Sequence, residues 1–285
     1  MDAKLEKIAK SRYFEVDSNT LIHYLDAGGG DPLIFFPGMA HSAECFINQI
    51  IHFSKTHRVI AIEPRGHGLS SKTPHGNNVR THGEDAIALA EELDLKDVTL
   101  IGWSAGAQYA WEYCKQSDFE NVKALVTIDL PPKETEGDDA RLQDPDWWYE
   151  MNLADLADFE AAFSNQAAYD ETWKSYIQDV MIQHPLDEDE LAKMMELRAE
   201  MPYWLCHDLL YSVETADYTS VAQEAAKRIP YLIFAGDYWG DGRIERYTEK
   251  HLPGAQTSVF GGHMMFFEYP DRFNDRLDRF LKEIS

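Results

Sequence analysis

Basic residues are scarce in this sequence of 285 residues. It has 26 Lys and Arg against 50 Asp and Glu, which gives a formal net charge of −24. Residues 133–217 hold 22 of the acidic and 5 of the basic residues, a net charge of −17. Because such a surface repels phosphate groups, we expect neither a nucleic-acid partner nor binding to an anionic membrane.

Long apolar runs are also missing. No stretch approaches the roughly 18 consecutive apolar residues of a membrane span. The charged residues among positions 1–7 do not fit the apolar core of a signal peptide. We therefore expect a cytoplasmic protein without a membrane segment.

Two patterns that indicate a bound metal or cofactor are absent as well. The 3 cysteines lie far apart and predict neither a metal site nor a disulfide framework: Cys45, Cys114 and Cys206. The glycine-rich stretch 27–32 lacks the order G-x-G-x-x-G, and no helix pattern follows it. We expect no metal and no cofactor.

Short apolar runs alternate with helix-like stretches along most of the chain. The runs that read as strands are 12–16, 21–25, 33–36, 58–62, 98–101, 122–128, 229–235 and 256–260. Helix patterns between them cover 43–55, 79–93, 107–115, 244–251 and 271–283. This alternation predicts an α/β fold with a mostly parallel, eight-stranded sheet and helices on both faces.

Residues 133–217 break this alternation. They contain no good strand pattern, and their helix-like pieces lie around 154–163, 169–183 and 188–200. We therefore predict a core formed by residues 1–132 and 218–285, with residues 133–217 inserted as a helical cap.

The stretch Gly102-Trp103-Ser104-Ala105-Gly106 lies between a strand pattern and a helix pattern. A G-x-S-x-G sequence in this context predicts a nucleophile elbow, a sharp turn that presents a serine. Gly102 and Gly106, which flank this turn, are small enough to let the strand and the helix approach each other closely. The alternative is an ordinary turn with a surface serine.

A nucleophilic serine needs a histidine base that is oriented by a carboxylate. His263 follows the last predicted strand, at the same edge of the sheet as Ser104. Three carboxylates remain candidates for the acid. Asp129 follows the strand after the elbow helix, whereas Asp237 and Asp241 follow the later strand.

The chain resembles the α/β-hydrolase superfamily along nearly its full length. The matching features are the Pro37-Gly38 loop, the Arg65-to-Ser70 turn, the elbow, the inserted cap, and the Gly262-to-Pro270 stretch. It is most similar to small cytoplasmic members described as esterases, lactonases or non-haem haloperoxidase-like proteins.

The resemblance also bears on the acid. Most of the family carries it three residues after the glycine that ends the later strand, where this sequence has Trp239. In a subgroup similar to zearalenone-type lactonases and cofactor-free quinolone dioxygenases, the acid ends the earlier strand and a Pro-containing loop follows. Asp129-Leu130-Pro131-Pro132 fits that pattern, so we favour Asp129 and keep Asp237 as second choice.

Acyl attack creates an oxyanion, which needs preorganised N–H donors. We expect these donors to be the backbone amides of Met39 and Ala105. For the substrate-binding wall the candidates are Trp103, His41, Trp147 and Trp148, each of which has an ordinary packing role as its alternative.

These features predict a serine hydrolase, a monomer or homodimer, that cleaves a neutral, fairly apolar carboxylic ester or lactone through an acyl-enzyme on Ser104. One alternative is a cofactor-independent dioxygenase of a quinolone-like heteroaromatic, in which the His263–Asp129 pair removes a proton. Another is a receptor that does not turn its ligand over.

Overall fold

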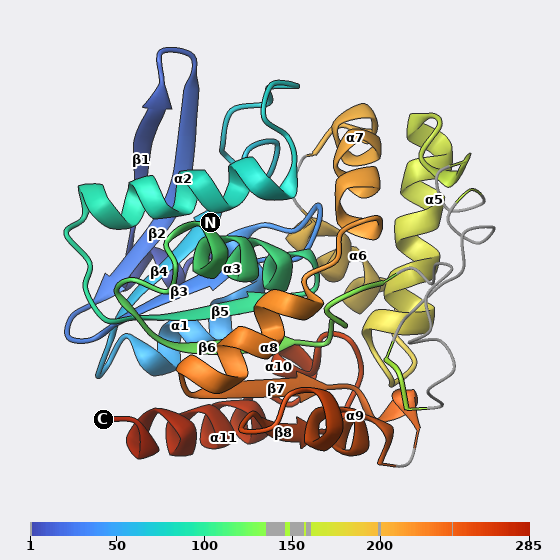
Figure 1. The fold of residues 1–285 in the computed structure, drawn as a ribbon. Coiled ribbons are helices and arrows are strands. Elements are labelled where there is room, and N and C mark those ends of the chain that lie inside the picture. Colours follow the sequence, from blue (N-terminus) through green and yellow to red (C-terminus); the bar gives the residue numbers. More distant parts are fainter. Residues whose placement is uncertain (1, 135–145, 149–156, 158–160, 199–200, 241) are drawn as a thin grey trace.

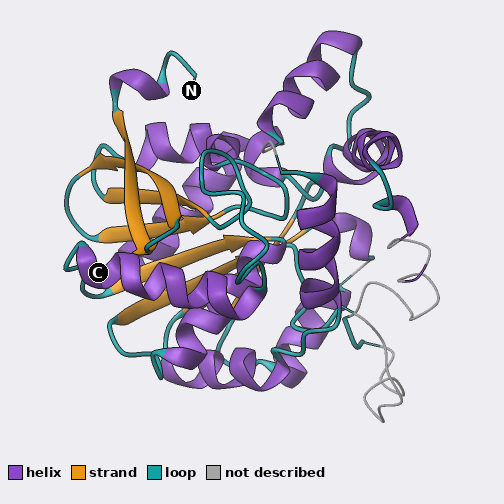
Figure 2. Cartoon of the chain, turned by 90° about the horizontal axis from the view of Figure 1, so that it is seen from above, coloured by secondary structure: helices purple, strands orange, loops and turns teal. Residues whose placement is uncertain are grey.

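An eight-stranded sheet runs through the molecule between two layers of helices (Figures 1 and 2). The structure is a computed structural model that describes residues 2–134, 146–148, 157, 161–198, 201–240 and 242–285. The strands follow the order β1-β2-β4-β3-β5-β6-β7-β8 across the sheet. They are β1 Ala9–Asp17, β2 Thr20–Gly28, β3 Pro32–Phe36, β4 Arg58–Glu63, β5 Val98–Trp103, β6 Val122–Ile128, β7 Tyr231–Ala235 and β8 Gln256–Val259.

The sheet is mostly parallel, as predicted. β2 pairs antiparallel with β1 and with β4. Every pair from β4 onward to β8 is parallel. β5 and β7 are buried along their whole length, because helices cover both faces. The carboxyl ends of β3, β5, β6, β7 and β8 therefore meet at one edge, where sheets of this type bind ligands.

Helices lie on both faces, which confirms the predicted architecture. α2, α3 and α8 pack on one face, and α1, α10 and α11 on the other (Figure 1). The helices of the core are α1 Ile47–Phe53, α2 Val79–Glu92, α3 Ala105–Gln116, α8 Thr219–Arg228, α9 Arg243–His251, α10 Met265–Glu268 and α11 Pro270–Glu283. Short helical turns are η1 Leu5–Lys7, η2 Ala43–Phe46 and η5 Asp237–Trp239. The sequence did not predict α8.

Residues 133–217 contribute helices that stand beside this edge of the sheet (Figure 1). They are α5 Gln166–Tyr176, the π-helical turn η4 Ile177–Met181, α6 Glu188–Leu197 and α7 Tyr203–Glu214. The described residues of this segment form no strand, only two isolated bridges. The helix expected at 154–163 falls mostly outside the described residues, and α7 was not predicted. The boundaries of the cap remain a prediction.

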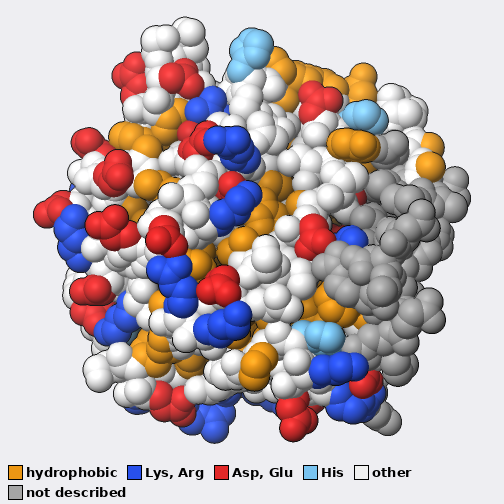
Figure 3. Space-filling view, viewed as in Figure 1, with side chains coloured by type: hydrophobic (Ala, Val, Ile, Leu, Met, Phe, Trp, Pro, Cys, Tyr) orange, Lys and Arg blue, Asp and Glu red, His pale blue; other side chains and the backbone are white. Residues whose placement is uncertain are grey.

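The visible surface mixes both signs of charge. On the described part of the face in Figure 3, Asp and Glu side chains are interspersed with Lys and Arg. No helix in the described ranges is long and apolar enough to cross a membrane.

Candidate active site

Ser104 lies between the end of β5 and the first residue of α3. Its backbone has φ 53° and ψ −132°, a conformation that is strained for a residue with a side chain. A Cβ on Gly102 would lie 2.2 Å from the carbonyl oxygen of Gly106. A Cβ on Gly106 would lie 2.2 Å from the carbonyl oxygen of Phe36. Only glycine fits at either position, so the strand, the sharp turn and the helix of an elbow are present.

Positive φ angles recur at the ends of neighbouring strands. Ala40 follows β3 with φ 58°, Ser104 follows β5 with φ 53°, and Asp129 follows β6 with φ 54°. Each such residue costs about 1–3 kcal/mol and persists only when its surroundings enforce it. Five further described residues with side chains have positive φ in the loops before β5 and β6, so positive φ alone does not mark a functional edge; Ser104 differs in that it directly precedes the first residue of a helix.

His263 lies in the loop after β8 and contacts Asp129. Its Nδ1 is 2.7 Å from Oδ2 of Asp129, and both side chains are buried. Because a carboxylate only accepts hydrogen bonds, Nδ1 donates and Nε2 carries the free lone pair. Nε2 is buried and has no hydrogen-bond partner among the described residues, Ser104 included. The indole of Trp103 donates to the carbonyl oxygen of His263 at 2.8 Å and fixes the loop.

Asp129 is fully buried and accepts hydrogen bonds on both oxygens. Oδ1 accepts from the amide of Gly236 at 2.7 Å and from the indole of Trp239 at 2.9 Å. Oδ2 accepts from the hydroxyl of Tyr238 at 2.5 Å and from His263. Burial raises the pKa of Asp129, but the hydrogen bonds from His263 and Tyr238 outweigh burial and hold this pKa below its ordinary value. The carboxylate stays ionised.

Asp237, the second choice for the acid, does not contact His263. It is exposed, and its Oδ1 accepts a hydrogen bond from the side-chain amide of Gln183 at 2.6 Å. The short helix η5 directs its side chain toward the cap segment and away from the sheet edge. Asp241, the third candidate, lies outside the described residues.

The two expected oxyanion donors flank Ser104. Ala105 is the first residue of α3, so its N–H has no partner within the helix. The loop that carries Met39 passes beside the serine, because a Cβ on Gly38 would lie 3.1 Å from Cβ of Ser104. These positions fit the predicted donor roles, which stay predictions.

Two of the expected wall residues are core side chains. Trp103 has no exposed surface, and it packs against Phe266 with ring centroids 5.1 Å apart. His41 is equally buried and lies against Trp103 and Trp173, at 4.8 and 5.5 Å. Its Nδ1 donates to the carbonyl oxygen of Met39 at 3.0 Å, and burial lowers its pKa to about 3. Among the described residues both side chains pack in the interior, which fits the packing alternative, and a substrate-binding role for them stays a prediction.

Trp147 and Trp148 also pack inward. Both are buried, and their rings lie 5.4 and 6.0 Å from the ring of Tyr247 in α9. Trp148 also meets Trp239 edge-on at 5.7 Å. The packing alternative therefore describes these two residues better than a roof over Ser104.

The segment around η4 binds directly to the histidine loop. The amide of Met264 donates to the carbonyl oxygen of Met181 at 2.9 Å. A Cβ on Gly262 would lie 2.9 Å from that same oxygen. The ring of Tyr176, at the end of α5, lies 5.9 Å from the ring of His263. The cap segment therefore contacts both the histidine loop and the ring of His263.

The sequence alone did not indicate the roles of three residues at this site. Tyr176 covers His263, while Tyr238 and Trp239 donate to Asp129. The signal for the last two was present, since they lie two and three residues after Gly236, which follows β7 at the edge of the sheet that holds Ser104.

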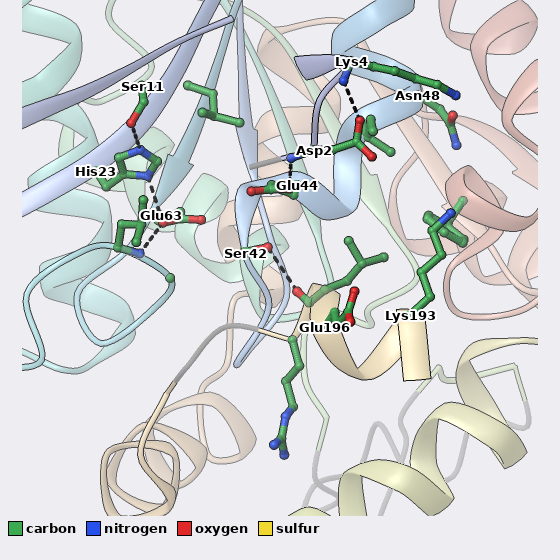
Figure 4. A pocket seen from close by; sticks show the side chains of 17 residues that line it. Asp2, Lys4, Ser11, His23, Ser42, Glu44, Asn48, Glu63, Lys193 and Glu196 are labelled. Carbon is green, nitrogen blue, oxygen red and sulfur yellow. Dashed lines mark hydrogen bonds and ion pairs between the residues drawn. The ribbon is translucent and has the colours of Figure 1, made fainter. Parts of the chain in front are cut away.

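A separate cavity of about 590 Å³ lies between the N-terminal segment, β2, η2 and the end of α6 (Figure 4). On its wall, Oγ of Ser11 lies 2.7 Å from Nε2 of His23, and Nδ1 of His23 lies 2.9 Å from Oε2 of Glu63. Ser11, His23 and Glu63 therefore form a continuous serine–histidine–carboxylate set of contacts away from Ser104.

The fold and the elbow define the class of protein. A family model described as the alpha/beta hydrolase fold matches residues 31–252, and the chain belongs to this family. A non-heme chloroperoxidase of Streptomyces lividans is 37% identical over 117 residues, which are 40% of this chain and 42% of that protein. The chain thus spans less than half the length of the curated relatives it matches.

Solved structures share the fold over almost the whole chain. A bromoperoxidase from Bacillus anthracis superposes with a TM-score of 0.83 at 21% identity, covering 96% of this chain and 100% of that chain. An esterase from Exiguobacterium antarcticum gives a TM-score of 0.83 at 19% identity, with the same coverage. The chain is similar in fold to both.

Proposed function

We propose that this protein is a serine hydrolase that cleaves a neutral, fairly apolar carboxylic ester or lactone. The observation that carries the proposal is the contact between His263 and Asp129, at 2.7 Å, beside a serine held at positive φ. Asp129 fixes the tautomer in which Nε2 of the imidazole is the base. The names of the esterase and haloperoxidase relatives are compatible with this chemistry.

In the proposed reaction, Oγ of Ser104 attacks the carbonyl carbon while its proton moves to Nε2 of His263. The amides of Met39 and Ala105 stabilise the resulting oxyanion, each by about 3 kcal/mol. His263 then gives its proton to the leaving alkoxide, and the acyl group stays on the serine. Water attacks this acyl-enzyme with His263 again as base, which releases the acid and restores the serine.

The side chains around the pair support an uncharged substrate. The rings of Trp173 and Tyr176 lie edge-on to each other at 5.9 Å. Trp173 contacts His41, and Tyr176 contacts His263. Arg198, which bridges to His41 through its backbone, is already paired with Asp170 at 2.7 Å. A strongly acidic chain also disfavours anionic substrates by long-range repulsion.

A fluorophosphonate probe tests the proposal. We expect mass spectrometry to find one adduct, on Ser104, and a panel of short and long esters and lactones to be turned over by the wild type only. The Ser104→Ala variant should lose both the adduct and the turnover. Full turnover by an unlabelled Ser104→Ala protein would contradict the proposal.

The dioxygenase alternative is supported by one observation. The part of the relay that is formed is the His263–Asp129 pair, because Nε2 makes no hydrogen bond to Ser104. A buried base of this kind is sufficient to remove a proton from a heteroaromatic ring. Oxygen uptake with quinolones, retained in Ser104→Ala, would favour this alternative over ester hydrolysis.

A further inference from the structure

Asp129 receives more hydrogen bonds than are needed to orient a histidine. Besides His263, it accepts from one backbone amide and from the side chains of two consecutive residues, Tyr238 and Trp239. We propose that Tyr238 and Trp239 are positioning residues that set how strongly Asp129 attracts the Nδ1 proton of His263. This inference rests on the proposed function, since it assigns their effect to the same base.

Trp239 holds the carboxylate in one orientation. Its indole and the Gly236 amide both donate to Oδ1, at 2.9 and 2.7 Å, which leaves Oδ2 for His263. The indole is itself fixed by ring contacts with Tyr238 at 5.1 Å and Trp148 at 5.7 Å. A rigid donor of this kind keeps the catalytic geometry within the narrow range that proton transfer requires.

Tyr238 acts on the charge of the carboxylate. Its hydroxyl lies 2.5 Å from Oδ2, the oxygen that also accepts from His263. A second donor on the same oxygen spreads the negative charge, so less of it faces the imidazole. Without this hydroxyl, Asp129 should hold the imidazolium more tightly. The base would then stay protonated, and inactive, up to a higher pH.

Among the residues that the structure describes, few other titratable groups face the pair. Tyr176 of α5 lies against His263, and His41, after β3, stays neutral because burial lowers its pKa to about 3. On the cap side, Nδ1 of His184 lies 2.9 Å from Oε1 of Glu268. A His184→Gln variant serves as the control for that group.

The test uses Tyr238→Phe and Trp239→Phe, each of which removes a donor and keeps an aromatic ring. Matched controls are Tyr211→Phe and Trp204→Phe on the exposed side of α7. We expect Tyr238→Phe to move the acidic limb of kcat/KM to higher pH. Trp239→Phe should lower kcat about tenfold, the effect of one hydrogen bond to a charged group. The controls should match the wild type.

A second readout does not depend on turnover. The Nδ1 proton of His263 should give a low-field NMR signal, which moves further downfield in Tyr238→Phe as its bond to Oδ2 strengthens. An unchanged signal and an unchanged pH profile in a folded variant would overturn the inference. If instead Ser104→Ala keeps full activity, the proposed function fails while the NMR result still decides the role of Tyr238. Should Trp239→Phe not fold, Tyr238→Phe alone decides.

Discussion

The described residues include two serine–histidine–carboxylate arrangements, Ser11–His23–Glu63 and Ser104–His263–Asp129, and they differ in the backbone around the serine. On hydrogen bonds alone, Ser11–His23–Glu63 is the more complete, because both of its contacts are formed at 2.7 and 2.9 Å. In the Ser104 arrangement only the contact between histidine and acid is formed. A complete set of hydrogen bonds within a triad is therefore, by itself, a poor criterion for a nucleophilic serine.

The backbone conformation distinguishes Ser11 from Ser104. Ser11 is exposed in the regular strand β1, paired with Leu25, and no helix begins after it. Ser104 is held at positive φ directly before the first turn of α3, where unpaired amides can face an oxyanion. The strained turn and the unpaired amides, more than the hydrogen bonds from serine to histidine to acid, therefore distinguish Ser104 from Ser11.

The two acids also differ in what they bind. Glu63 accepts from the backbone amides of Ala43 at 3.0 Å and Leu69 at 2.6 Å, so it ties two loops to the end of β4. Asp129 accepts from the loop after β7 and from His263. We infer that Glu63 stabilises the fold, whereas Asp129 orients the base.

The largest effect should come from paired serine variants. Ser104→Ala is expected to lower kcat/KM for an ester by about 10⁶-fold, as when a triad nucleophile is removed. Ser11→Ala should change it by no more than about twofold, which is typical of a surface substitution. Steady-state kinetics on both variants decides. Loss of activity in Ser11→Ala would end the distinction drawn above.

Paired acid variants give the next largest effect. Asp129→Asn should lower kcat/KM by about 10⁴-fold, because the amide favours the wrong imidazole tautomer. Glu63→Gln should leave kcat/KM near the wild-type value in the folded protein. Measuring both at one pH, with far-ultraviolet circular dichroism as the folding control, sharpens the comparison. Equal losses would assign both acids to the reaction.

Glu63→Gln should instead lower stability. Its carboxylate is buried and ties together His23 and two backbone amides. Replacing a charged acceptor by an amide weakens these bonds, and we expect a loss of about 2 kcal/mol in the free energy of unfolding. Urea denaturation measures it. A stability equal to that of the wild type would remove the structural role.

The smallest effect concerns acid unfolding. Burial raises the pKa of each acid, but the hydrogen bonds from His23 to Glu63 and from His263 to Asp129 outweigh burial. The pKa of Glu63 therefore lies below 4.5, and that of Asp129 below 3.8. A depressed pKa contributes stability above the ordinary value and loses it as pH falls through the folded value. The melting temperature should therefore decrease as the pH is lowered below about 4.5. This decrease should be less steep in the Glu63→Gln variant than in the wild type. Parallel curves for variant and wild type would contradict this.

Local pattern was sufficient for the sheet and for the pair His263–Asp129. Buried strands read as apolar runs, and strand ends place their following residues at one edge. The pattern did not predict α7 or α8, although α8 has an alternation typical of a surface helix. It also could not show that Trp103, at the end of β5, and His41, in the loop after β3, turn inward, because side-chain direction at a strand end or in a loop depends on packing partners distant in sequence.

Gly262 determines how closely the cap segment packs against the histidine loop. The missing side chain is what lets the carbonyl of Met181 approach the histidine loop. Any larger residue would work as a wedge between the two segments. A substitution at position 262, in the core, is therefore expected to move the cap segment away from the histidine loop without any change in the cap's own sequence.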